Sequence, residues 1–159
     1  MEIGATKAVQ DRLKTTKIEE SKGASLVFCW DTHLTKIKGR NVLFIVNASN
    51  RYTIAMTDIE PRNWNYYTMY IRSVIHGVMQ EMGYSEDQIG QYFKMSGDTT
   101  VTKTHGRKSV GGINRMVMDA QYFGKKLEKE AKYQWELSEY LNRDICQPEG
   151  FDAYGYPSE

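Results

Sequence analysis

A short basic segment ahead of a predicted helix has the residue types that suit anion binding. Lys103, Arg107 and Lys108 precede a helix that Ser109 is expected to cap. Arg115 extends the basic character along that helix. Free N–H groups at a helix N-terminus favour anions, so a phosphate group is a suitable ligand. The glycines that follow match neither a phosphate-binding loop nor a dinucleotide fingerprint. Nucleic-acid or nucleotide binding is therefore an alternative to the simpler interpretation, an exposed basic loop before a capped helix.

A carboxylate and an imidazole lie two residues apart at Asp31 and His33. Such a pair can do acid–base work, so a hydrolase or transferase built on these two residues is a further, weaker hypothesis. The neighbouring Asn47 and Asn50 are better interpreted as turn residues that hydrogen-bond a hairpin backbone. Nucleophile, base and orienting group nowhere occur at a spacing that demands an enzyme, and no catalytic residue is predicted.

Metal ligands are sparse in the sequence. Cys29 and His33 offer two zinc ligands, but no second pair completes a set of four, so neither a metal nor a cofactor is predicted. His105 is interpreted as a loop residue. Two cysteines, Cys29 and Cys146, are too few for a secreted disulfide scaffold and suit a reducing cytoplasm.

The C-terminal region is rich in aromatic residues next to a charged helix. This composition resembles that of protein interfaces, where aromatic side chains anchor the partner and charges surround them. The alternatives are that the tail folds back on its own domain or forms a homo-oligomer. The predicted interface residues are Trp135, Tyr140, Phe151, Tyr154 and Tyr156.

The elements that position these residues begin with strands. A short strand is expected at residues 2–5, followed by a brief helix. The stretch from Trp30 to Met56 contains alternating or continuous apolar runs separated by turns at residues 39–41 and 47–50, which predicts consecutive antiparallel strands. A further polar strand is expected at residues 99–104.

Apolar residues recur at intervals of three and four over residues 64–82, which predicts an amphipathic helix. Ser85 and Gln88 form a capping-box pattern for a second helix. A third, long helix is expected from Ser109 to about Leu141. We predict an α+β fold: an antiparallel meander sheet of about five strands, with helices packed on one face and a long C-terminal helix. Residues 1–124 are predicted to form a compact domain and residues 125–159 a charged helical extension with an aromatic tail.

Length and charge restrict the function classes. The 159 residues fit one domain with a sizeable core, and 21 basic against 20 acidic residues give no global field that attracts polyanions. No apolar stretch reaches the length of a membrane span, and no signal core is present near the start. The sequence therefore predicts a soluble cytoplasmic protein.

Three segments resemble a family of small bacterial and mobile-element proteins known only as a domain of unknown function. They are TKAVQDRLK, VLFIVNASNRYTIAM with the preceding Trp30 and Leu34, and TKTHGRKSVGGINRM. The resemblance covers about residues 3–120. The matching motifs consist of strand, turn and cap residues, so the resemblance implies a fold rather than an activity. Family members often have a Cys where this chain has Ala5, which argues against a metal or redox role.

Members of this family that lie beside plasmid and phage genes imply an accessory role. The leading hypothesis is a non-enzymatic phage or mobile-element protein that binds another protein, with inhibition of a bacterial defence nuclease such as a CRISPR effector as its concrete form. Binding of nucleic acid is the alternative.

Overall fold

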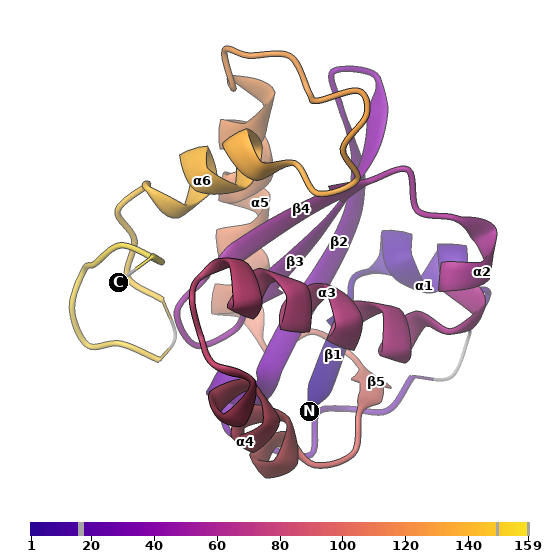
Figure 1. Ribbon diagram of the computed structural model, residues 1–159, viewed down its shortest axis with the longest axis vertical. Coiled ribbons are helices and arrows are strands. Elements are labelled where there is room, and N and C mark those ends of the chain that lie inside the picture. Colours follow the sequence, from indigo (N-terminus) through magenta and orange to yellow (C-terminus); the bar gives the residue numbers. More distant parts are fainter. Residues whose placement is uncertain (16–17, 149, 159) are drawn as a thin grey trace.

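A five-stranded sheet lies at the centre of the computed structural model, which describes residues 1–15, 18–148 and 150–158. The strand order is β4-β3-β2-β1-β5 (Figure 1). The strands are β1 (Glu2–Ala5), β2 (Cys29–Ile37), β3 (Arg40–Asn47), β4 (Thr53–Thr57) and β5 (Thr100–Thr102). The helices are α1 (Lys7–Leu13), α2 (Pro61–Asn65), α3 (Tyr67–Glu81), α4 (Glu86–Ser96), α5 (Arg107–Gln121) and α6 (Trp135–Asn142), with a 3-10 turn at Leu26–Phe28. The predicted combination of a five-stranded sheet with helices is confirmed.

The sheet is mixed, so the prediction of a purely antiparallel meander is wrong. β2, β3 and β4 are antiparallel neighbours, but β1 lies parallel to both β2 and β5. The chain between β1 and β2 contains α1 and a long connection. A parallel pair requires a crossover of a dozen or more residues, and this connection supplies it. β1 therefore has a neighbouring strand on each side.

The two turns of the meander use the residues that the sequence indicated, with one shift in position. Lys38 and Gly39, with φ of 49° and 83°, connect β2 to β3. Positive φ at both central residues is typical of a type I′ turn, so this turn begins before the expected residues 39–41. Between β3 and β4, Oδ1 of Asn47 accepts hydrogen bonds from the backbone N–H groups of Ser49 (2.9 Å) and Asn50 (3.3 Å).

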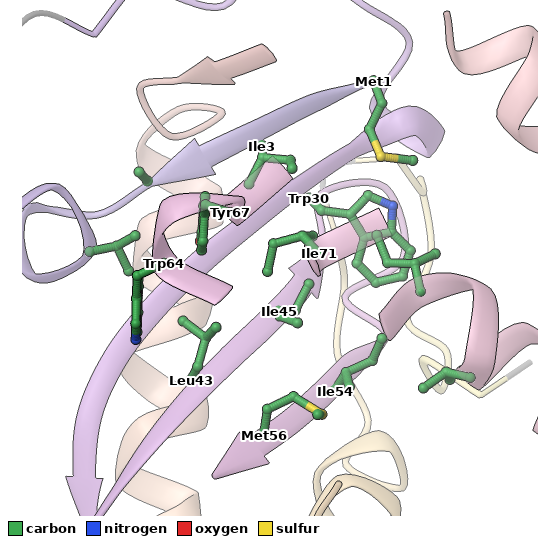
Figure 2. Packing of buried hydrophobic residues seen from close by; sticks show 14 residues of the cluster. Met1, Ile3, Trp30, Leu43, Ile45, Ile54, Met56, Trp64, Tyr67 and Ile71 are labelled. Atoms are coloured by element: carbon green, nitrogen blue, oxygen red, sulfur yellow. The ribbon is translucent and has the colours of Figure 1, made fainter. Parts of the chain in front are cut away.

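The first hydrophobic core lies between one face of the sheet and helices α1 to α4. The apolar residues of α3 recur at the helical spacing that predicted it, and they face the sheet. The capping box of Ser85 and Gln88 at the start of α4 is confirmed. Figure 2 labels these core residues: Met1, Ile3, Trp30, Leu43, Ile45, Ile54, Met56, Trp64, Tyr67 and Ile71.

Helices cover the opposite face as well, so the prediction of helices on one face is wrong. Leu43 and Ile45 of β3 enter the first core, whereas Phe44 of the same strand enters a second core. Successive side chains of a strand point to opposite faces, so a continuous apolar run such as VLFIV is typical of a strand that is covered on both. The second core is completed from α5 and α6, by residues such as Ile113 and Leu137.

The predicted long helix from Ser109 to Leu141 is also wrong. α5 ends at Gln121, and α6 begins only at Trp135. The chain turns back between them because Leu127, in the connection, is buried in the second core together with Leu137 and Leu141. Residues after 124, expected as an extension, thus contribute to the core of the sheet domain.

Three residues at four-residue spacing cover the outer edge of β4, two with their side chains and one with its backbone N–H. Asn142 accepts a hydrogen bond from the N–H of Thr53 (2.7 Å) and donates to its carbonyl (2.9 Å). Ser138 Oγ accepts from the N–H of Ala55 (3.0 Å), and the N–H of Gln134 donates to the Ala55 carbonyl (2.9 Å). An uncovered strand edge would pair with other chains, so α6 protects the sheet as well as filling its core.

Candidate functional site

A buried cluster of ionisable side chains lies where β1, β2 and the loop before α5 meet. Nδ1 of His105 is 2.7 Å from Oδ1 of Asp31, and Nε2 of the same ring is 3.1 Å from Oε2 of Glu2. The side chain of His105 is 3% exposed, that of Asp31 0% and that of Glu2 5%. The imidazole therefore bridges two carboxylates that are shielded from water.

The register of the parallel strands assembles this cluster. Glu2 is paired with Cys29 and Gly4 with Asp31, so all four residues lie on the face of the sheet that α5 covers. A Cβ atom on Gly4 would overlap Oδ1 of Asp31. The absence of a side chain at Gly4 therefore makes room for the Asp31 carboxylate and, beyond it, for the ring of His105.

Further hydrogen bonds hold the two carboxylates in place. Ser109 of α5 donates its hydroxyl to Oδ2 of Asp31. Ser21 donates to Oε2 of Glu2 (2.6 Å), and the N–H of Lys22 donates to Oε1 (2.8 Å). Ser109 was predicted to cap α5, and this is wrong: the N-cap is Gly106. The serine hydroxyl is used by the buried carboxylate instead.

The electrostatics of the cluster favour a protonated imidazole. Burial by itself lowers the pKa of His105, but the hydrogen bonds and electrostatic interactions with Asp31 and Cys29 outweigh it and raise the pKa to about 10. Burial raises the pKa of Glu2, yet the hydrogen bonds from Ser21, Lys22 and His105 bring it below its ordinary value. Both results describe an imidazolium held between two carboxylates.

Cys29 adds a sulfur to the same place. Its Sγ, a carboxylate oxygen of Glu2 and a ring nitrogen of His105 all lie within 4.8 Å of one another. The thiol is fully buried and donates weakly to the carbonyls of Ala24 (3.7 Å) and Ser25 (3.4 Å). These three residues are a set of side chains that can hold a metal ion.

The predicted pair of Asp31 and His33 is not formed. Asp31 binds His105, whereas Nδ1 of His33 lies 3.1 Å from Oγ1 of Thr6. Burial lowers the pKa of His33. The two residues share a strand face, but each has its own partner, so the geometry does not support the acid–base pair of the hydrolase hypothesis.

The predicted basic residues separate into two groups. Lys103 forms an ion pair with Glu20. Lys108 and Arg115, by contrast, line a groove of 330 Å³ together with Arg51, and we name it the basic groove. Arg107 is exposed and is not among the residues that line it. The sequence thus identified two of the three basic residues of this groove.

The sequence analysis did not identify Arg51 as a residue of the basic groove. A glycine in α5 explains the position of its side chain. Its Cζ would lie 2.6 Å from a Cβ atom on Gly112, so the guanidinium rests directly against α5. Arg51 itself adopts a positive φ of 62° at the end of the β3–β4 turn. The glycine pair before Ile113 was the signal in the sequence, because a helix interior normally disfavours glycine.

The five predicted aromatic residues are 43–70% exposed: Trp135, Tyr140, Phe151, Tyr154 and Tyr156. The grooves found among the described residues divide three of them. Tyr154 lines the basic groove, Tyr140 lines a groove beside α6, and Phe151 lines an apolar groove on the other side of the tail. Of these five, Phe151 lies at the edge of a largely apolar groove.

We name this last hollow the apolar groove. It has a volume of 410 Å³ and lies beside α3, the start of α4 and the C-terminal tail. It is lined, among others, by Val27, Tyr52, Met79, Met82, Tyr84 and Phe151.

Comparison with known proteins gives a family without an assigned activity. A family model described as a domain of unknown function (DUF6933) matches residues 2–159. The match includes the C-terminal tail, which the resemblance in the sequence left outside. No curated protein and no solved structure matches the chain. Among the described residues, none of the helices has the length and apolar character needed to cross a membrane.

Proposed function

Because the chain belongs to this family, described as a domain of unknown function, we propose its function from its own surface: it is a non-enzymatic protein that binds another protein through the apolar groove. The single observation that carries this proposal is the gathering of exposed apolar side chains around one hollow.

Four large apolar side chains at the groove are more than 40% exposed: Val27, Met82, Tyr84 and Phe151. Interfaces are enriched in aromatic residues and methionine, and their strongest contacts are anchors that fill pockets. Methionine side chains also adapt to the shape of a partner. A protein that presents an aromatic or aliphatic anchor fits this groove.

We further propose that the partner is a cytoplasmic host protein. The mobile-element setting of the proteins that this chain resembles supports a bacterial defence nuclease, including a CRISPR effector, as the partner class. A second copy of the chain is the competing occupant. Size measurement of the purified chain distinguishes the two.

The test is a pull-down from bacterial lysate with the tagged chain, with nuclease added and at low and high salt. We expect the chain to capture a protein in stoichiometric amount, and this binding should persist with nuclease and at high salt. The Met118→Glu variant should still capture the protein, whereas the Met82→Glu variant should not. Met118 is an exposed methionine of α5 that is not among the residues of the apolar groove, so it is a matched control. Equal capture by both variants would contradict the proposal.

A second candidate function is binding of a phosphate-bearing ligand, such as a nucleotide or nucleic acid, in the basic groove. Arg51 forms no ion pair with a carboxylate among the described residues, although it is half-buried. Among the residues that the structure describes, Lys108 donates to the Pro148 carbonyl (3.2 Å). Asp119 and Asp144 also line the groove, so its cationic surplus is small.

This candidate is tested by titrating nucleotides and a short oligonucleotide at several salt concentrations. We expect affinity to fall with salt, to be lost in Lys108→Glu and to remain in Arg107→Glu, since Arg107 does not line the groove. An equal loss in both variants would place any binding at the exposed loop instead.

A further inference from the structure

The geometry points to a binding site for a divalent transition-metal ion formed by Glu2, Cys29 and His105, with zinc as the ion that the donor set favours. The three ligands come from β1, from the start of β2 and from the loop before α5. They are 27 and 76 residues apart along the chain, so the site exists only in the folded protein. The inference is separate from the proposed protein binding.

The distances fit a tetrahedral ion after small shifts. With Zn–N and Zn–O of ~2.0–2.1 Å and Zn–S of ~2.3 Å, ligand atoms in a tetrahedral site lie roughly 3.3–3.6 Å apart. Nε2 of His105 and Oε2 of Glu2 are already 3.1 Å apart, and the three donor atoms lie within 4.8 Å of one another. Side-chain movements on the order of 1 Å therefore bring the three donor atoms to tetrahedral spacing, and a water molecule would take the fourth position.

Asp31 supports the histidine as a ligand. Metal-bound histidines usually donate their second N–H to a carboxylate, which fixes the tautomer and the ring orientation. Oδ1 of Asp31, 2.7 Å from Nδ1, accepts that bond here and leaves Nε2 for the metal. Asp31 is itself held by Ser109, and Glu2 by Ser21. The supporting hydrogen bonds that a metal site needs are thus in place.

The charges of the cluster also suit a cation. The carboxylates of Glu2 and Asp31 face the His105 ring from two strands, and the sulfur of Cys29 lies beside them. A dication placed among these groups is compensated by the buried carboxylates, so it is not an unpaired charge in the interior.

An ion-pair network without metal joins Glu2, Asp31 and His105, and in it the thiol of Cys29 is a further hydrogen-bond partner of the ring. A nucleophilic role for Cys29 is not supported, because the thiol is fully buried and lines none of the grooves found in the described part of the chain. Nitrogen, sulfur and oxygen donors together are typical of zinc sites. A metal is the ligand that uses all three groups.

The experiment uses the full chain, purified with a chelator that is then removed, and titrated with Co²⁺ followed by Zn²⁺. The purification tag belongs at the C-terminus, because the amino group of Met1 donates to the Asp98 carbonyl (2.9 Å) beside Glu2. We expect one equivalent of Co²⁺, a near-ultraviolet sulfur-to-cobalt charge-transfer band, the intense visible bands of a four-coordinate ion, and displacement by Zn²⁺.

Cys29→Ser should remove the charge-transfer band and weaken Zn²⁺ binding by more than roughly 100-fold, the upper end for residues that only support a ligand. Cys146→Ser is the matched control and should keep both the charge-transfer band and the affinity for Zn²⁺. The chain has only these two cysteines, so a band that survives in Cys146→Ser assigns the sulfur to Cys29 even if Cys29→Ser does not fold.

Failure to bind one equivalent of Co²⁺ or Zn²⁺, or a cobalt spectrum without the sulfur band, would overturn the inference. So would a band that disappears in Cys146→Ser. Met82→Glu should bind metal as the unchanged chain does, which separates this result from the outcome of the pull-down.

Discussion

His105 and Asp31 are joined by three hydrogen bonds across 74 residues of sequence. Nδ1 of the ring lies 2.7 Å from Oδ1, and the backbone N–H of His105 donates to both carboxylate oxygens at 3.2 and 3.3 Å. These bonds fix the loop before α5 to the central strand β2. The imidazolium that faces Asp31 also makes the stability of the fold depend on pH.

We expect the free energy of unfolding of the chain, measured with a chelator present, to fall as pH rises above about 6.5. The folded pKa of His105 is raised from 6.5 to about 10, so its stabilisation is complete below the unfolded value and is lost as pH rises through the folded one. The charged and titratable groups that face the ring are Glu2 from β1 and Asp31 and Cys29 from β2.

Urea unfolding at pH 6, 7, 8 and 9 measures this dependence. The control is His105→Asn, which keeps a polar side chain but does not titrate. A pH slope that is equal in both proteins would contradict the assignment to His105.

Gly4→Ala should destabilise the fold by ~2–4 kcal/mol, because the added Cβ would overlap Oδ1 of Asp31 in a site with no room to relax. Gly77→Ala in α3 is the matched control. A Cβ atom there meets nothing within 4 Å, and alanine favours the helix by about 1 kcal/mol. Denaturant midpoints compare the two variants, and a Gly4→Ala protein as stable as the original would contradict the packing described for Asp31.

Asn142→Ala should cost about 1–3 kcal/mol, because it leaves both the N–H and the carbonyl of Thr53 without their side-chain partner. Glu139→Ala, on the exposed side of α6, removes only a surface ion pair with Arg143 and should change stability by less than about 1 kcal/mol. Thermal unfolding measures both. Static light scattering should also show increased association of Asn142→Ala, since the edge of β4 is then less protected.

Gly112→Ala should lower the affinity of the basic groove for a phosphate-bearing ligand without reducing stability. Its Cβ would displace the end of the Arg51 side chain, which is flexible, while alanine improves the helix. Gly111→Ala gains the same helix propensity but meets nothing within 4 Å, so its affinity should match that of the original chain. If the two variants bind equally well, Arg51 does not contribute to ligand binding.

Local features of this protein could be predicted from neighbouring residues. The turn chemistry of Asn47, the capping box of Ser85 and the helical spacing in α3 depend on residues a few positions apart, and the structure has all three. The continuous apolar run in β3 likewise indicated a buried strand, although it did not indicate that both faces were covered.

The candidate site could not be predicted in the same way. Glu2, Cys29 and His105 are far apart in the chain, and each taken alone resembles an ordinary strand or loop residue. Only two local signals pointed to the site: acidic residues at buried strand positions, and a glycine inside β1.

Most strands and helices could thus be predicted from the chain alone, because hydrogen bonds within turns and helices and the period of apolar residues act over short separations. The parallel pairing of β1 with β2, which sets Gly4 beside Asp31 and Glu2 beside Cys29, arises in the folded chain. Tertiary packing also places α5 over that face, with His105 in the loop that precedes the helix. The pairing of β1 and the position of α5 depend on the register between strands and on packing across both faces of the sheet. Both are determined by contacts between residues that are distant in sequence.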